Sequence, residues 1–262
     1  MRVLVAGLVG LLCCTLTAAH AQDGGVFKIL KLEGNQVRWQ LPRNGAPLVV
    51  TYRTVNETVE FPGARNCRKI TKLDELIAAS EISPAALQTE IAAAFAMWEA
   101  AANITFREAA EGTRPDILIG AQVEPEGWAF AEVFYDTASS EPIKPISRAL
   151  VCLNPLRRWK IGFNGDLKTY DLRYTLAHEI GHAIGLDHPG GGGNQVMGYR
   201  YEERFRALQP GDIRGAVLLY GEPSQYPAPR TQSDRLHAEA GQSPMRRMAK
   251  RWGTRAFTAR SP

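Results

Sequence analysis

The chain has 262 residues, of which 45% are hydrophobic and 22% charged, an ordinary globular composition with enough apolar residues for a sizeable core. Its formal net charge of +4 comes from the C-terminal end, since residues 222–262 hold eight Lys or Arg against three Asp or Glu. Because the basic residues are concentrated in this segment, the composition does not support a nucleic-acid-binding domain, and we expect no nucleic-acid partner.

The first 21 residues have the pattern of an export signal. Arg2 gives a positive start, Val3–Thr17 is almost wholly apolar, and Ala19-His20-Ala21 is a small-x-small cleavage pattern. An uncleaved membrane anchor is the alternative, but the apolar run is shorter than the roughly 20 residues that span a bilayer. We therefore predict a signal peptide over residues 1–21, a secreted or periplasmic protein, and no transmembrane segment after cleavage.

Two cysteines follow the predicted signal, Cys67 and Cys152. In an oxidising compartment an even number of cysteines predicts one disulfide between them. Two unpaired buried thiols are one alternative. A second alternative, in which Cys67 blocks a metal in a latent precursor, is disfavoured because this residue follows the first expected strand.

The N-terminal part contains short strands before the first helix. A segment over residues 22–36 leads to strands at Val37–Leu41 and Leu48–Thr54, and Phe61–Ser80 is expected to be an irregular insertion loop. Ser83 is a good N-cap, and Pro84 suits the first position of a helix. The apolar face of this helix repeats at Leu87, Ile91, Ala94 and Trp98. Further strands are expected at Ile104–Arg107, Asp116–Gly120, Trp128–Tyr135 and Ala149–Leu153.

The C-terminal part contains two expected helices and an extended tail. The helices cover about Leu172–Gly185 and Pro210–Tyr220, with a flexible loop at Gly190–Gly193 between them. Gly221 ends the second helix. After it the composition shifts to Pro, Ser, Gln and Arg, which predicts a basic, disordered tail over residues 222–262.

The most specific signal is the stretch HEIGHAIGLDH. His178 and His182 lie four residues apart, on one face of a helix, so both can bind one ion. Gly185 permits the positive φ that turns the chain back and returns His188 to the same ion. Three imidazoles leave one position open for water, which is typical of a catalytic zinc, and Glu179 is placed to act as general base on that water.

The motif resembles the signature of the metzincins, HExxHxxGxxH followed by a Met-turn. HEIGHAIGLDHPG, VMGY and LQPGDIRGAVLLYG are similar to the branch that holds matrixins and serralysins. TYR at residues 51–53, PDILIG at 115–120 and GWAFAEVFY at 127–135 follow the matrixin order more loosely. The resemblance covers residues 37–221 as one catalytic domain. It implies an α+β fold: a twisted, mixed sheet with an antiparallel edge strand, an active-site helix, a Met-turn and a C-terminal helix.

The resemblance also implies an activity, a secreted zinc endopeptidase that hydrolyses peptide bonds with zinc-activated water. Met197 should pack beneath the ligands as an apolar floor. Tyr199 occupies the offset at which serralysins and astacins carry a tyrosine that helps to hold the oxyanion, although a packing aromatic is the alternative. Tyr201 matches the matrixin tyrosine that walls the substrate pocket. A protein or peptide substrate should add to the edge at Trp128–Tyr135, and a monomer is expected.

The sequence departs from the family pattern at its expected metal sites. The absence of histidine between Asp23 and Arg173 predicts that the second, structural zinc of many matrixins is missing. Calcium is possible but unassigned, because Asp116, Asp136 and Asp166 are equally compatible with turn or surface roles. Two other functions stay open: a non-peptidase exported zinc hydrolase, and a binding module on the same scaffold. An intact Glu179 argues against the binding module, which has no need of a base.

Overall fold

A computed structural model describes residues 25–43, 48–190 and 194–223. The predicted signal peptide and almost all of the predicted tail lie outside these residues, so both stay predictions. None of the helices in these ranges has the length and apolar character that crossing a membrane requires.

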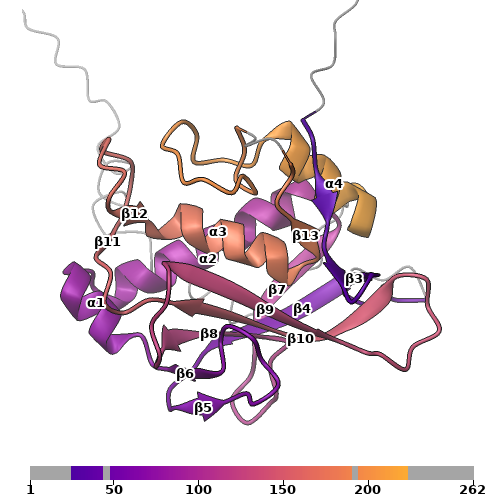
Figure 1. Cartoon of the computed structure of the whole chain (residues 1–262), viewed down its shortest axis with the longest axis horizontal. Coiled ribbons are helices and arrows are strands. Elements are labelled where there is room, and N and C mark those ends of the chain that lie inside the picture. The colour runs from indigo at the N-terminus through magenta and orange to yellow at the C-terminus, as the bar shows by residue number, and fades with distance from the viewer. Residues whose placement is uncertain (1–24, 44–47, 191–193, 224–262) are drawn as a thin grey trace, which may run out of the picture.

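A mixed sheet forms the centre of the molecule (Figure 1). Its main path runs in the order β2 (Lys31–Leu32), β3 (Asn35–Arg38), β10 (Lys144–Leu153), β8 (Ile117–Gln122), β4 (Leu48–Thr54) and β7 (Ile104–Glu108). Neighbours from β3 to β7 on this path are parallel. Strand β9 (Ala129–Tyr135) pairs antiparallel with β10. The predicted fold class, a mixed sheet with an antiparallel edge strand and helices, is confirmed.

Helices α2 (Pro84–Ala101) and α3 (Leu172–Ala183) cover one face of this sheet (Figure 1). The Ser83 side chain caps α2 by accepting a hydrogen bond from the Ala86 amide at 3.2 Å. The four apolar residues expected on one face of α2 are all buried. Trp98 extends from that face and its indole N–H donates to the Ala177 carbonyl at 2.9 Å, which fixes α2 against α3.

The chain reverses direction directly after α3. Gly185 has a φ of +98°, and a Cβ at this position would lie 2.4 Å from the Val37 carbonyl oxygen. Only glycine therefore fits this turn. The turn leads into β13 (Leu186–Asp187), which pairs antiparallel with β1 (Lys28–Ile29). The final helix, α4 (Pro210–Tyr220), lies near this pair (Figure 1).

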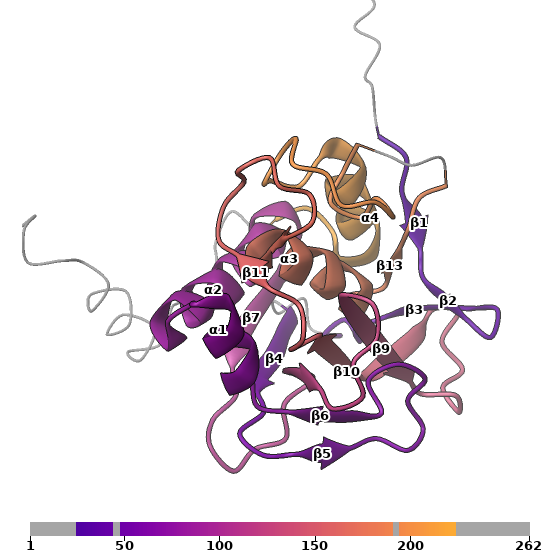
Figure 2. The ribbon, with the colours of Figure 1, turned by 60° about the vertical axis from the view of Figure 1, so that its left-hand side comes forward.

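The segment expected to be an irregular loop is more regular than the sequence indicated. It contains strand β6 (Lys69–Thr71) and helix α1 (Asp74–Ser80). Strand β6 pairs with β5 (Val59–Glu60) and with β8. Strands of two and three residues are too short to show an alternating pattern, so they could not be predicted from the sequence. We call residues 55–72 the β5–β6 lobe. Figure 2 shows it on the side of the sheet opposite the helices.

The β5–β6 lobe encloses a second, smaller core. Its buried members are Val55, Phe61, Ala64, Cys67, Ile70, Leu150 and Cys152. A disulfide joins Cys67 of the lobe to Cys152 of β10, across a sequence separation of 85. The lobe is also attached to β9, because Glu132 Oε2 accepts hydrogen bonds from the Arg65 and Asn66 amides at 2.9 Å each.

Candidate active site

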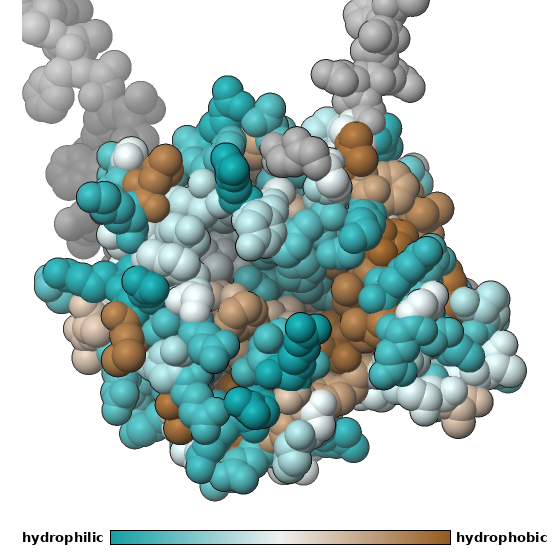
Figure 3. Space-filling model, in the orientation of Figure 1, coloured by the Kyte–Doolittle hydropathy of each residue, from teal (hydrophilic) through white to brown (hydrophobic). Residues whose placement is uncertain are grey.

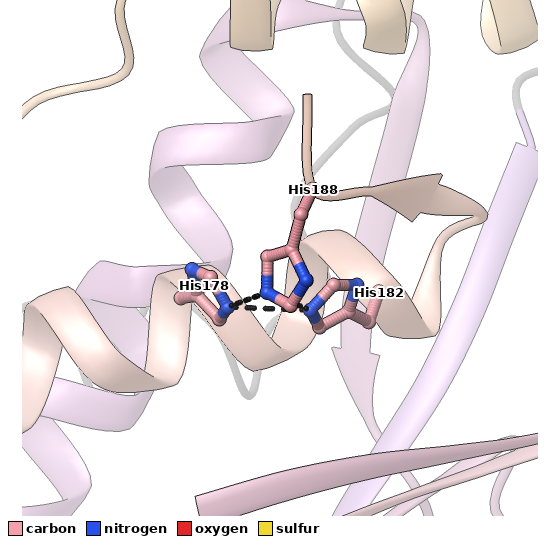
Figure 4. Close-up of side chains that lie close together, drawn as sticks. All are labelled: His178, His182 and His188. Carbon is pink, nitrogen blue, oxygen red and sulfur yellow. Dashed lines mark hydrogen bonds between the residues drawn. The ribbon is translucent and has the colours of Figure 1, made fainter. Parts of the chain in front are cut away.

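Three histidine side chains converge at the C-terminal end of α3. His178 and His182 project from the helix, and His188 follows β13 (Figure 4). The Nε2 atom of His188 lies 3.0 Å from that of His178 and 3.2 Å from that of His182, and the last two are also 3.2 Å apart. The helical spacing and the turn at Gly185 together produce this convergence.

Backbone carbonyls orient two of the three rings. His178 Nδ1 lies 2.6 Å from the Val196 carbonyl oxygen and His182 Nδ1 lies 2.8 Å from that of Leu186. A carbonyl only accepts, so each Nδ1 carries the proton and each Nε2 presents a lone pair. Burial, and next the neighbouring imidazoles, hold the pKa of His178 well below its usual value and lower the pKa of His182 to about 4. Both rings are therefore neutral at physiological pH.

This arrangement fits a zinc ion. Imidazole nitrogens about 2.0–2.1 Å from one tetrahedral zinc lie about 3.3 Å from one another, and the observed separations of 3.0–3.2 Å are close to that. The Nε2 lone pairs of His178 and His182 converge without a proton between them, and this arrangement favours binding of a cation. Within the described ranges, these three histidines are the one group of three or more His, Cys, Asp or Glu side chains placed to hold a metal.

Glu179 follows His178 directly in α3 and is buried. Burial raises the pKa of its carboxyl to about 8, and a hydrogen bond with the Ala131 backbone acts in the opposite direction. This carboxyl has no basic partner among the hydrogen bonds and ion pairs of the described residues. A buried carboxyl with a pKa raised into this range can accept and release a proton near neutral pH.

Met197 packs against α3 at Gly181. A Cβ on Gly181 would lie 2.2 Å from the Met197 sulfur, so the glycine makes room for it. Asp212 of α4 holds this turn in place by accepting from the amides of Val196 and Met197, each at 3.0 Å. Asp212 was missed from the sequence, because its function depends on the packing of α4 against the turn.

The histidines lie in a cleft of about 490 Å³. One wall is aromatic: the rings of Trp128 and Tyr170 stack with centroids 3.9 Å apart, and those of Tyr170 and Tyr201 stack at 4.1 Å. Other lining residues come from the N-terminal segment and the β5–β6 lobe, namely Leu30, Leu32, Arg65 and Asn66. Figure 3 shows this face of the molecule, on which apolar residues gather towards β3 and α4. Of these lining residues, Tyr201 was predicted from the sequence for the pocket wall and Trp128 for the substrate-binding edge.

The two tyrosines near Met197 occupy different environments. Tyr199 is 77% exposed and its ring meets that of His188 edge to face, with centroids 5.2 Å apart. The Tyr201 hydroxyl accepts from the Asp171 amide and donates to Glu203, at 2.8 Å each. The Tyr199 ring thus lies beside His188, whereas the Tyr201 ring is fixed in the wall of the cleft.

A partly buried ion-pair network holds the first turn of α3. Arg206 contacts Asp171, the N-cap of α3, at 2.7 Å and Glu90 of α2 at 3.0 Å. Arg173 contacts the same Glu90 at 2.8 Å. These charges come from α2, from the start of α3 and from the loop that contains Arg206, so no local sequence pattern indicated the network.

The aspartates considered as calcium ligands accept hydrogen bonds from the protein itself. Asp116 Oδ2 accepts twice from Thr51, at 2.7 Å each. Asp136 and Asp166 each accept from the amide two residues further on, at 2.9 Å. These contacts are those of turn and loop residues, and no calcium ligand is assigned.

Comparison with known proteins decides the family. The family model described as Matrixin matches residues 73–221. The chain belongs to the matrixin family. This matrixin is 30% identical to mouse stromelysin-3 over 161 residues, which cover 58% of the chain and 30% of that relative. It is 27% identical to rat stromelysin-2 over 198 residues, which cover 73% of the chain and 39% of that relative.

The matches cover well under half of these relatives' own length. The resemblance to metzincins of the matrixin type, predicted from the motifs, is confirmed. The matched region begins at residue 73, so the β5–β6 lobe lies before it.

Proposed function

We propose that this matrixin is a zinc-dependent endopeptidase that cleaves peptide bonds in proteins or peptides. The observation that carries the proposal is the convergence of three histidine Nε2 atoms within 3.2 Å of one another, in an open cleft beside the buried Glu179. His178, His182 and His188 would hold one zinc ion. When bound, zinc lowers the pKa of a water molecule to about 7 and polarises the substrate carbonyl.

Glu179 supplies the proton transfer. Its carboxylate accepts a proton from the attacking water and then delivers it to the nitrogen of the leaving amine. The carboxyl gains and loses one proton in each cycle, so it is unchanged at the end. Its burial supports this role, because burial raises the pKa of a carboxyl towards neutrality.

The free side of β9 would bind the peptide. Among the described residues β9 pairs with β10 alone, so its other edge can accept an extended substrate as an added strand. We assign Tyr199, next to His188, to stabilisation of the oxyanion, and Tyr201 to the wall of the pocket for a substrate side chain. Both assignments are supported by the positions of the rings in the cleft.

We also propose that the protein is exported. The signal pattern over residues 1–21 supports export, and so does the Cys67–Cys152 disulfide, because disulfides persist in oxidising compartments.

Cleavage of a peptide library by the purified protein tests the function. We expect endoproteolytic products, loss of cleavage with a zinc chelator, and recovery when zinc is added back. Release of product from cell-wall fragments, without cleavage of any library peptide or of casein, would instead identify a different zinc hydrolase. Zinc binding without any turnover would identify a binding module.

A further inference from the structure

A lysine ammonium lies in a cage of oxygen atoms beside the pocket. Lys160 of β11 (Trp159–Lys160) has a side chain only 11% exposed. Its Nζ lies 2.5 Å from Glu203 Oε1, donates to the Asp166 carbonyl at 2.6 Å and also donates to Asn164 Oδ1. Three oxygen acceptors match the three N–H donors of an ammonium group.

Glu203 connects this lysine to the turn at Asn164 and Gly165 and to Tyr201. Its side chain is 5% exposed. Oε2 accepts from the Asn164 amide at 2.9 Å and from the Gly165 amide at 2.6 Å, and Oε1 accepts from the Tyr201 hydroxyl at 2.8 Å. Burial raises the pKa of Glu203, but the hydrogen bonds from Lys160 and its other donors outweigh burial and lower the pKa overall. The carboxylate is therefore charged at neutral pH.

Tyr201 carries this connection to the active-site helix. Its hydroxyl accepts from the amide of Asp171, whose carboxylate caps α3 by accepting from the Tyr174 amide at 2.8 Å. Its ring stacks on Tyr170 and meets Tyr174 edge to face, with centroids 5.2 Å apart. Lys160, Glu203 and Tyr201, which we call the pocket-wall cluster, thus form a continuous series of contacts from β11 to the aromatic wall.

We propose that Lys160 and Glu203 are positioning residues that fix Tyr201 and thereby set which substrate side chains the pocket accepts. The proposal rests on the peptidase function proposed above. Neither residue lines the cleft, so neither touches the substrate, and both act through the Tyr201 hydroxyl. Removing one charge of a nearly buried pair leaves the other without compensation, so the surrounding loops should rearrange.

The variants Glu203→Gln, Glu203→Ala and Lys160→Met test the proposal. Glu203→Gln keeps the shape of the side chain and removes its charge, and it replaces Glu203→Ala in both measurements if that variant does not fold. Arg158→Met is the matched control: Arg158 is two residues from Lys160 and pairs with Glu81 at 2.9 Å, but that pair is 68% and 81% exposed. An exposed pair contributes little, so the control should behave as wild type.

The first measurement is kcat/KM for peptides that differ in the one side chain that enters the pocket. For Glu203→Ala we expect the ratio between the best and the poorest side chain to fall about tenfold, because pocket fit discriminates on that scale. The value for a peptide with alanine at that position should change less than about twofold. Unchanged ratios in a folded Glu203 variant would overturn the proposal.

The second measurement is hydrogen–deuterium exchange of peptides covering residues 161–171 and 199–206. Faster exchange in both segments is expected for Lys160→Met and for the Glu203 variants, but not for Arg158→Met. Unchanged exchange would show that the cluster does not position the wall and would overturn the proposal even without any assay of cleavage. A wild-type protein that cleaves no peptide would overturn the peptidase function and the selectivity role together. Variants that cleave with unaltered selectivity would overturn only the selectivity role.

Discussion

The two faces of the sheet are stabilised in different ways. The face under α2 and α3 packs against a large core, and its three candidate ligands lie within the eleven residues from His178 to His188. The opposite face carries the β5–β6 lobe over a core of seven buried residues, closed by a disulfide between residues 85 positions apart. The helix-bearing face therefore holds the chemistry in one short stretch, whereas the lobe depends on contacts that are distant in sequence.

The two faces also differ in how far the matrixin family model covers them. The region matched by the matrixin model starts at residue 73, after the lobe, and includes every candidate ligand. We infer that changes on the helix-bearing face affect zinc and catalysis, and that changes in the lobe affect stability first.

The largest effect is expected from His188→Ala. Loss of one of three protein ligands should reduce the zinc content well below one ion per chain and abolish cleavage, because the remaining pair is a poor zinc site. Elemental analysis after dialysis measures the zinc content. A variant that keeps one zinc per chain would show that His188 is not a ligand, and would break the claim that one short stretch holds the metal.

Tyr199→Phe and Tyr201→Ala should differ in kind. A hydroxyl that stabilises only the oxyanion affects kcat and kcat/KM together, and its loss typically costs about 10²–10³ in rate. We expect this loss for Tyr199→Phe with all peptides alike. Tyr201→Ala should instead reorder the preferred side chains, since it removes a wall of the pocket. Wild-type rates for Tyr199→Phe would make this exposed tyrosine a packing residue only.

Removing the disulfide should act on stability and leave the chemistry unchanged. For the double variant Cys67→Ser, Cys152→Ser we expect the free energy of unfolding to fall by about 2–5 kcal/mol. At temperatures where the variant is folded, kcat/KM should stay within about twofold of wild type. A larger loss of activity with zinc retained would contradict the separation of the two faces, and would direct attention to Arg65 and Asn66, where the lobe reaches the cleft.

The smallest effect concerns pH. The folded-state pKa of Glu203 is lowered, so its contribution to stability is present above its unfolded-state pKa and is lost as the pH falls through the folded-state value. Glu203→Gln does not titrate, and its stability should therefore decline less steeply than that of wild type between about pH 5 and pH 3. Thermal denaturation across this range measures the difference, and parallel curves would argue against a charged, hydrogen-bonded Glu203.

Much of the active-site region could be predicted because local chemistry determines it. The i, i+4 spacing of His178 and His182 and the glycine turn at Gly185 are readable from eleven consecutive residues. The start of α2 was equally clear, since Ser83 and Pro84 mark it. By contrast, the two-residue strand β5 has no pattern of its own and forms only because β6 lies beside it.

The rest depended on tertiary packing. Lys160 and Glu203 contact each other only because the loop that holds Glu203 folds against β11, and Asp212 reaches the turn at Met197 only because α4 packs against that turn. Single charged residues in a sequence are usually solvated surface residues, so nothing local distinguished Lys160 and Glu203. Asp212 does have a local signal, because it lies three residues after the N-cap Gln209 in a capping box. The β9 edge was located from the sequence, but the aromatic wall beside it required the stacking of rings from three segments.

The most direct test of the central claim compares zinc content and peptide cleavage in wild type and Glu179→Ala. In the proposed mechanism Glu179 is the base and not a ligand, so the variant should keep about one zinc per chain and lose cleavage by a factor of at least about 10²–10⁴. Wild type should show one zinc per chain and cleavage that a chelator abolishes. Substantial cleavage by zinc-loaded Glu179→Ala would contradict the account, since another group would then be the base.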